Sequence, residues 1–180
     1  MDGHRVEGTQ DTQEIEGIKG HRDGVIDGVI ADVKSASPFS FKKFQNGLTP
    51  EVDSFGYIDQ GGAYLHAGQT DDKVQDKNRF FFFVMDKVSG EITTDIHTKS
   101  EKDYPTFFKT RKSQMQSDTP PDRGFEPVPD GSSGNEVLGV NCSYCAFKHS
   151  CHENLRTFMS YKGPKFFTKV LREPRMQEIW

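Results

Sequence analysis

The chain has 180 residues, of which 33% are hydrophobic and 28% are charged, and its formal net charge is −4 at pH 7. This length allows one domain with a real core, and the 15 Phe residues argue against a disordered chain, because disorder tends to exclude aromatics. No run approaches the roughly 18 apolar residues of a membrane span, and the N-terminus lacks a signal-peptide pattern. We therefore expect a soluble, cytoplasmic protein without a membrane partner. The acidic net charge by itself gives no support to nucleic-acid binding.

The first strongly patterned segment runs from Gly17 to Ala36 and predicts two strands around a tight turn. Asp27-Gly28 is a preferred two-residue hairpin turn, flanked here by Val25-Ile26 and Val29-Ile30. Residues 1–16 are polar and carry no clear pattern.

The turn also predicts the register of this hairpin. If Ile26 faces Val29, the numbers of paired residues add up to 55, so Asp23 is opposite Asp32 and His21 is opposite Lys34. Because side chains alternate along a strand, these four residues are expected on one face. The other face is expected to pack on the core and carries Ile26, Val29, Ala31 and Val33.

Further elements follow along the chain. Residues 37–48 are expected to form a loop with aromatic anchors, which are Phe39, Phe41 and Phe44. Thr49-Pro50-Glu51 marks a helix start, with a capping Thr, Pro at the first helical position and an acid in the first turn. This helix is expected to run to about Ala67, although Gly61-Gly62 inside it costs stability.

The remaining segments predict strands and one more helix. Residues 79–85 form an apolar run typical of a buried strand, and residues 92–97 follow a turn as its partner strand. Residues 101–116 predict a helix, and residues 117–136 are rich in Pro, Gly, Ser and Asp, as linkers are. The tail from residue 163 to 180 is expected to be partly extended.

The two facing carboxylates of the hairpin predict a metal site. Like charges directly opposite each other are destabilising, and a divalent cation such as Mg²⁺ or Mn²⁺ favours such hard oxygen ligands. Asp23, Asp32 and the backbone carbonyl of Val33 are the expected ligands. Lys34 would then orient a water or offset charge on a phosphate. The plainer alternative is a surface hairpin with Asp–Lys salt bridges.

The order of these residues resembles the PD-(D/E)XK nucleases. Asp23 followed by Asp32-Val33-Lys34 is similar to the D…(D/E)-x-K signature, and the segment from Gln60 to Tyr64 is similar to the Q-x-x-x-Y motif of the RecB-type exonuclease branch. The resemblance implies a restriction-endonuclease-like core in an α/β or α+β fold, with a mixed central sheet flanked by helices. It implies catalytic roles for Asp23, Asp32, Lys34, Gln60 and Tyr64, and metal binding by Asp23, Asp32, Val33 and His21.

Three cysteines form a C-x2-C-x5-C motif at Cys142, Cys145 and Cys151. An odd, tightly clustered set indicates metal or cluster ligation rather than a disulfide framework. The motif resembles the C-terminal part of the iron–sulfur staple of AddB-type nucleases, which implies a 4Fe–4S cluster on these thiolates. The sequence contains no fourth Cys. His149 or His152 could complete the site, a Cys₃His set would also suit zinc, and an empty site is the third alternative.

These observations give one leading hypothesis and two alternatives. We expect a nuclease core over residues 1–116, with one interpretation being that it lacks the family's N-terminal helix, a linker over 117–136, and a cysteine segment with its tail over 137–180. The leading hypothesis is a Mg²⁺- or Mn²⁺-dependent exonuclease acting on single- or double-stranded DNA ends. Residues 155–173 resemble the ends of phage-encoded exonucleases, which would place it in a host cytoplasm. The alternatives are a catalytically incomplete nucleic-acid-binding or assembly module with a structural metal site, and a zinc-binding module.

Overall fold

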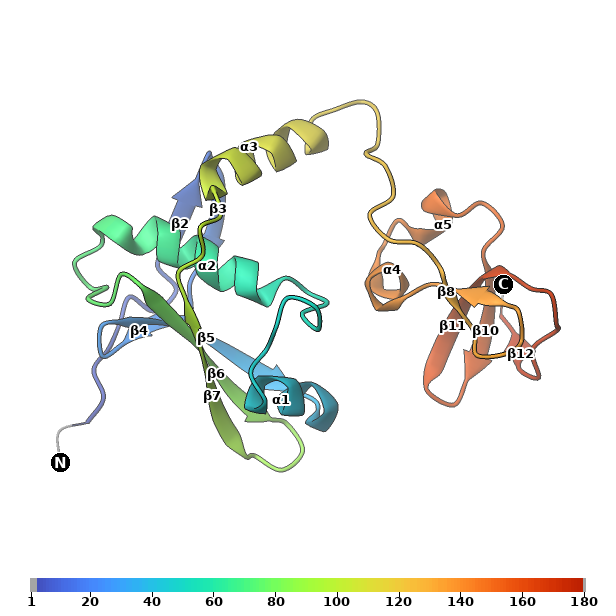
Figure 1. Ribbon diagram of the computed structural model, residues 1–180, viewed down its shortest axis with the longest axis horizontal. Helices are drawn as coiled ribbons and strands as arrows, with labels where there is room; N and C mark the ends of the chain where they lie inside the picture. The colour runs from blue at the N-terminus through green and yellow to red at the C-terminus, as the bar shows by residue number, and fades with distance from the viewer. Residues whose placement is uncertain (1–2, 180) are drawn as a thin grey trace. The chain divides into compact units, whose positions relative to one another are not determined.

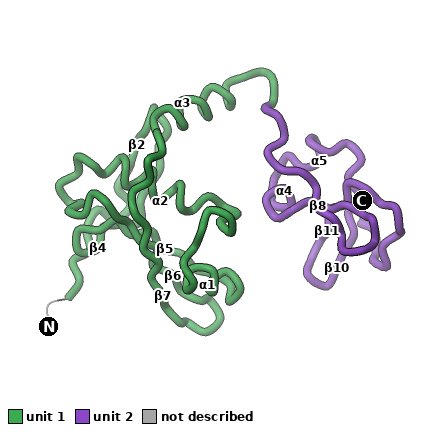
Figure 2. The backbone as a smooth tube through the Cα atoms, in the orientation of Figure 1, with its two compact units in different colours: residues 1–120 green, residues 121–180 purple. Residues whose placement is uncertain are grey.

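The computed structural model describes residues 3–179, which fall into two compact units, one up to Pro120 and one from Pro121 onward (Figures 1 and 2). The division lies inside the segment that was expected to be a linker. None of the helices in the described part of the chain is long and apolar enough to cross a membrane.

The first unit combines a five-stranded mixed sheet with helices, so its fold is α+β. The sheet has the order β1-β4-β5-β6-β7, with β5 and β6 parallel and the other neighbours antiparallel. Its strands are β1 (Val6–Glu7), β4 (Gly24–Ile26), β5 (Val29–Ala36), β6 (Arg79–Asp86) and β7 (Ile92–Thr98). The last two confirm the strands predicted over residues 79–85 and 92–97. The parallel pair β5–β6 requires a long crossover, and the chain between them contains helices α1 and α2.

The predicted turn at Asp27-Gly28 is confirmed. Both residues have positive φ, 50° and 79°, as a two-residue hairpin turn requires. The ladder pairs Ile26 with Val29, Val25 with Ile30 and Gly24 with Ala31, as the register predicted. The ladder ends at Gly24, so Asp23 lies just beyond it.

The expected pairing of His21 with Lys34 is wrong. His21 belongs to β3 (Ile18–His21), which pairs with β2 (Thr12–Ile15) in a separate two-stranded sheet. The reason is a second tight turn at Glu16-Gly17, where both residues again have positive φ, 52° and 76°. This turn closes its own hairpin before the chain reaches β4.

The helices differ from the expectation in two places. Helix α1 (Pro38–Gln45) replaces the expected loop, since Ser37 accepts a hydrogen bond from the Ser40 N–H at 3.3 Å and Pro38 suits the first helical position. Helix α2 (Tyr57–Ala67) begins later than Thr49, because residues 49–52 form a turn and Gly56 has a φ of 72°. A short 3₁₀ helix (Gly68–Thr70) follows, and helix α3 (Tyr104–Met115) confirms the helix predicted over residues 101–116.

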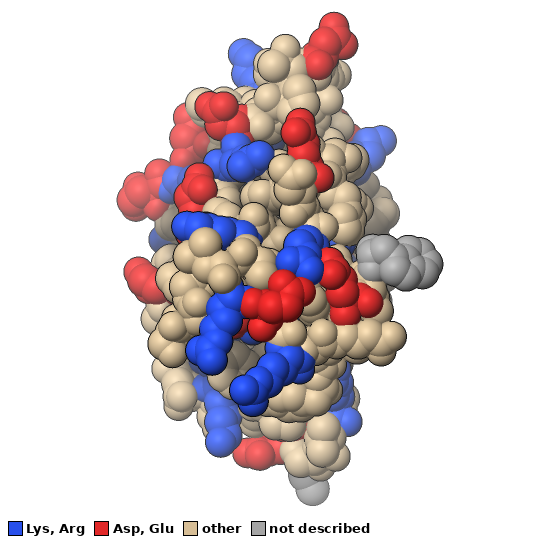
Figure 3. Space-filling model, turned by 90° about the vertical axis from the view of Figure 1, so that its right-hand side faces the viewer, with Lys and Arg blue, Asp and Glu red and all other residues tan. Residues whose placement is uncertain are grey.

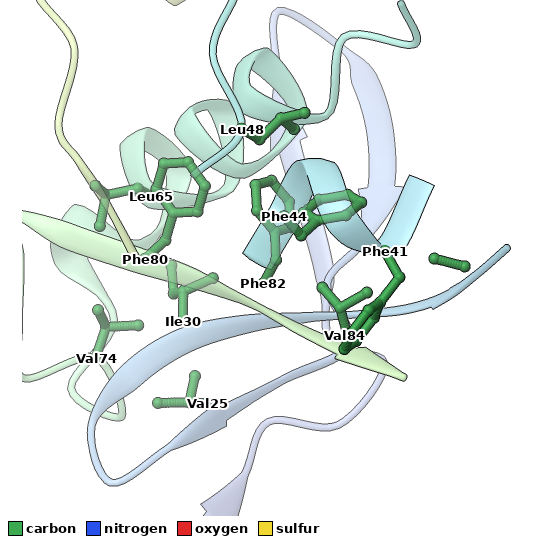
Figure 4. Close-up of a cluster of buried hydrophobic side chains, with 11 residues drawn as sticks. Val25, Ile30, Phe41, Phe44, Leu48, Leu65, Val74, Phe80, Phe82 and Val84 are labelled. Carbon is green, nitrogen blue, oxygen red and sulfur yellow. The ribbon is translucent and has the colours of Figure 1, made fainter. Parts of the chain in front are cut away.

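The core of this unit lies between the sheet and helices α1 and α2. Figure 4 shows side chains of both helices directed at the sheet. The buried cluster contains Val25, Ile30, Ala36, Phe41, Phe44, Leu48, Leu65, Val74, Phe80, Phe82 and Val84. Phe39, in contrast, is 75% exposed and lies outside this core.

The expected core face of β5 is therefore the wrong one. Ile30 and Asp32 are two residues apart and therefore point to the same side of the strand. Both are buried beneath the helices, whereas Val33 on the other side is 51% exposed. The helices of the crossover determine this orientation, because they supply apolar partners to the Ile30 side. Consequently Asp32 and Lys34 continue the core face instead of opposing it.

The second unit has its own antiparallel five-stranded sheet, with the order β12-β10-β11-β9-β8. Its strands are β8 (Val128–Pro129), β9 (Glu136–Val137), β10 (Arg156–Ser160), β11 (Gly163–Lys169) and β12 (Gln177–Glu178), and its helices are α4 (Val140–Tyr144) and α5 (Lys148–Cys151). Val137, Phe158 and Phe167 form its small core.

Candidate active site

Lys34 is the centre of a polar cluster where β5 meets α2. Its Nζ atom lies 2.6 Å from Asp32 Oδ2 and donates a hydrogen bond to Gln60 Oε1 at 3.1 Å. The same atom lies 4.7 Å from the centre of the Tyr57 ring. The structure thus brings together Asp32, Lys34 and Gln60, three residues singled out from the sequence.

Asp23 is held beside the same strand, just beyond the end of the β4–β5 ladder. Its Oδ2 atom accepts a hydrogen bond from the Val33 N–H at 2.7 Å, and its Oδ1 atom accepts one from Gln10 Nε2 at 3.1 Å. A backbone N–H of β5 therefore fixes one carboxylate beside Asp32 and Lys34. Gln10 is an unexpected contributor, because it lies in the unpatterned segment before residue 17.

The buried residue Arg22 determines where Asp23 can reach. Its side chain has no exposed surface and makes ion pairs with Asp11 at 2.9 Å and with Asp71 at 2.6 Å. These contacts hold the chain where β3 ends and β4 begins. Asp23, the next residue, is positioned between the two hairpins by this anchor.

Asp32 is a carboxylate in an unfavourable place. It is 3% exposed, and burial raises its pKa, with the Asp23 charge adding to the rise and the Lys34 ammonium opposing it. Among the described residues, Lys34 is the one partner of the buried Oδ2 atom. A buried acceptor beside a second carboxylate fits a divalent cation.

The number of ligands restricts which cation fits. Across residues 3–179, no three or more His, Cys, Asp or Glu side chains are grouped to hold a metal ion. Asp23 and Asp32 are thus a two-carboxylate set, which suits Mg²⁺ because Mg²⁺ usually keeps several waters and binds one or two protein carboxylates together with substrate phosphate oxygens.

Tyr64 hydrogen-bonds to the backbone of His21 and not to its imidazole. The Tyr64 hydroxyl donates to the His21 carbonyl oxygen at 2.9 Å, which ties α2 to the end of β3. The His21 imidazole is exposed, with Nδ1 3.3 Å from the Gln10 carbonyl oxygen and 3.4 Å from Thr12 Oγ1. It lies on the β2–β3 hairpin, so the strand pairing that suggested it as a ligand is gone.

Tyr57 is a neighbour of the cluster that sequence reasoning missed. It lies one helical turn before Gln60, and residues three apart share a helix face. That signal was present in the sequence, because the helix expected from Thr49 to Ala67 already contained both residues.

The three cysteines lie on or beside α4 and α5 in the second unit. All are partly buried and unbridged, and burial raises the pKa of the Cys142 thiol, with the thiols of Cys145 and Cys151 adding to the rise. His152 is buried, which lowers its pKa, and His149 is exposed with its ring edge-on to Phe166. Binding of an iron–sulfur cluster or zinc by this segment stays a prediction.

Surface charge gives little direction. On the face drawn in Figure 3, Lys and Arg side chains are interspersed with Asp and Glu. In the second unit, for example, Arg156 pairs with both Glu173 and Glu178 at 2.8 and 2.7 Å. The described residues of this face therefore present no broad basic surface that would indicate a nucleic-acid ligand.

The Lys34 cluster supports a definite chemistry. Its two carboxylates can share a hard cation, its ammonium can neutralise an anionic group, and the Gln60 amide holds that ammonium in place. Comparison of the chain with protein-family models, with curated proteins and with solved structures gives no match.

Proposed function

We propose that the chain is a Mg²⁺- or Mn²⁺-dependent deoxyribonuclease of the PD-(D/E)XK type, with a restriction-endonuclease-like core, that degrades DNA from its ends. The observation that supports this most is the contact of Lys34 Nζ with both Asp32 Oδ2 at 2.6 Å and Gln60 Oε1 at 3.1 Å, beside Asp23. A lysine that pairs with a buried carboxylate, close to a second carboxylate, is suited to phosphodiester hydrolysis, because negative charge develops on the phosphate during that reaction.

Each residue then has a defined task. Asp32 and Asp23 would hold the cation, together with the Val33 carbonyl. When bound, the cation supplies Lewis acidity and lowers the pKa of a water. The Lys34 ammonium neutralises charge on the scissile phosphate. Gln60 fixes that ammonium by accepting its hydrogen bond.

Tyr64 acts as a positioning residue in this proposal. Its hydroxyl bonds the His21 carbonyl and so fixes α2 against the end of β3. Gly20 permits this approach, since a Cβ there would lie 3.1 Å from the Tyr64 hydroxyl.

A second candidate function is a nucleic-acid-binding module without turnover. One observation favours it: only two carboxylates, Asp23 and Asp32, gather at the cluster in the described part of the chain. Such a module would bind DNA with a steep salt dependence and would not cleave it.

The test is cleavage of end-labelled linear DNA and of circular DNA with Mn²⁺. We expect the wild type to degrade only linear DNA, and EDTA to stop it. Lys34→Ala and Asp32→Asn should each lower the rate by about 100-fold or more, because each removes a charge that acts on the phosphate or the cation. The matched controls Lys87→Ala and Asp72→Asn, at exposed positions of the same unit, should keep the wild-type rate.

Two results would decide against a nuclease site at the Lys34 cluster. Equal cleavage by wild type, Lys34→Ala and Asp32→Asn would place the chemistry elsewhere. A folded wild type that binds DNA but leaves it intact with Mn²⁺ would favour the binding module.

A further inference from the structure

An aromatic pocket opens beside the Lys34 cluster, within the first unit. It has a volume of about 670 Å³ and is bordered by the β2–β3 hairpin, α2 and its preceding turn, and α3. We call it the aromatic pocket, and its principal lining residues are Ile15, Ile18, Phe55, Tyr57, Phe107 and Arg111. This volume falls within the range of roughly 300–1,000 Å³ of small-molecule sites.

The aromatic pocket is continuous with the proposed catalytic residues. Tyr57, Gln60 and Tyr64 all line it. Lys34 Nζ contacts two of these three, Gln60 by a hydrogen bond and Tyr57 over its ring at 4.7 Å. A group bound in the pocket and a phosphate at Lys34 could therefore belong to the same molecule.

The charges around the aromatic pocket favour an anion that carries flat rings. Arg111 lines it with its guanidinium carbon 5.3 Å from the centre of the Phe107 ring, and Lys19 lines it as well. The acidic lining residue Asp59 is paired with Lys102 Nζ at 2.6 Å, and that ammonium also lies 3.7 Å from the Phe107 ring centre. The acid is thus offset by Lys102, and Lys19 is likewise paired with Glu14 Oε2 at 3.8 Å, so the positive charge of the rim comes from Arg111.

We propose that the aromatic pocket binds an unpaired nucleobase, so that the preferred substrate is a single-stranded DNA end. Aromatic side chains stack on the faces of bases, and nearby cations track the backbone. In a duplex these faces are covered by neighbouring base pairs, so only an unpaired base can enter. The position of the phosphate at Lys34 rests on the proposed function, whereas base binding by Phe107 and Tyr57 does not.

The experiment measures binding without cleavage. The fluorescence anisotropy of labelled (dT)15 and of a blunt hairpin duplex is titrated with the full chain in EDTA. Phe107→Ala should weaken (dT)15 binding about tenfold, or about 1.4 kcal/mol, as loss of a stacking partner does. Phe39→Ala, which removes a 75% exposed ring on α1, is the matched control and should change nothing.

A second pair of variants guards against a folding effect at Phe107. Phe107→Leu keeps an apolar side chain and removes the ring, so it should also weaken (dT)15 binding while unfolding at the wild-type temperature. Arg111→Gln should weaken binding and lower its salt dependence more than Lys109→Gln, an exposed charge change on the same helix.

The outcomes separate this proposal from the nuclease assignment. Unchanged (dT)15 affinity in both Phe107 variants, or a duplex bound as tightly as (dT)15, would overturn base binding in the pocket. Absence of cleavage with Mn²⁺, alongside (dT)15 binding that depends on Phe107, would remove the nuclease activity and leave the pocket assignment standing.

Discussion

At the scale of single residues, Asp32 shows a conflict between stability and the proposed chemistry. Its carboxylate is buried on the core side of β5, and its pKa is raised mainly by that burial. A group with a raised pKa stabilises the fold only while it is protonated. If the site needs this carboxylate ionised, its ionisation lowers the free energy of unfolding.

This conflict predicts a pH-dependent effect of Asp32→Asn in the absence of divalent cations. Native Asp32 holds its proton more tightly than the unfolded chain does, so wild-type stability from this group is complete at low pH and is lost as pH rises through the raised pKa. At pH 7 the variant should be more stable than wild type by roughly 1 kcal/mol, with loss of the Lys34 ion pair offsetting part of the gain. The difference should shrink toward pH 4, as measured by thermal unfolding.

The exposed substitution Asp72→Asn is the control for this effect, and it should show no such pH trend. Adding Mn²⁺ should stabilise the wild type and not Asp32→Asn, because a ligand stabilises only the state that binds it. A variant less stable than wild type at pH 7 would contradict the account of Asp32 as a carboxylate whose burial costs more than its ion pair with Lys34 returns.

At the scale of elements, the two glycines of α2 explain how the helix reaches the sheet. A Cβ at Gly61 would lie 2.1 Å from Phe80 Cε2, and one at Gly62 would lie 2.0 Å from the Tyr104 hydroxyl oxygen. Phe80 is 1% exposed and packs against Phe82 and His97, so its ring has no free direction in which to move. The two glycines lower the intrinsic stability of the helix but allow it to pack closely against Phe80 and Tyr104.

We therefore expect Gly61→Ala to destabilise the protein despite the better helix former. The gain in propensity is about 1 kcal/mol, while overpacking costs about 1–3 kcal/mol, so the net loss in urea unfolding should be up to about 2 kcal/mol. Ser113→Ala on the exposed side of α3 gains propensity without a clash and should be neutral or stabilising. Equal stabilisation by both substitutions would mean that α2 can move away from Phe80 at no cost.

The elements also divide what the sequence could predict from what it could not. Local signals sufficed for the Asp27-Gly28 hairpin and the strand after Asn78, because turn chemistry and an apolar run act over a few residues. The start of the helix at Pro38 could have been predicted from Ser37-Pro38. The Glu16-Gly17 turn could have been predicted as well as the Asp27-Gly28 turn. The face of β5 that meets the core was not readable, since it depends on where the crossover helices pack.

The candidate site divides in the same way. Strand alternation was sufficient to place Asp32 and Lys34 on one face, whereas Gln60 was assigned to the site only by the resemblance to the Q-x-x-x-Y motif; the structure brings all three together. The partners of Asp23 and the aromatic pocket needed the fold. Phe107 and Tyr57 line the same pocket because α3 packs beside the β2–β3 hairpin, which no local pattern encodes.

At the scale of the whole molecule, each unit builds its core from its own residues. The larger cluster draws on residues 25–84, and the smaller one draws on Val137, Phe158 and Phe167. All residues of the Lys34 cluster and of the aromatic pocket lie before Pro120. The cysteines belong to the other unit, so the proposed nuclease chemistry and any cluster or zinc binding are assigned to different units.

We therefore expect a chain that ends at Pro120 to fold and to cleave linear DNA with Mn²⁺. The large core and every proposed catalytic group remain in it, so its thermal unfolding should be a single cooperative transition and its rate per molecule should be comparable to that of the full chain. In the full chain, replacing Cys142, Cys145 and Cys151 by Ser together should leave cleavage unchanged while removing any bound iron or zinc. A shortened chain that unfolds cooperatively and does not cleave DNA would show that residues 121–180 take part in catalysis or DNA binding, and it would move the search for the missing group to α4 and α5.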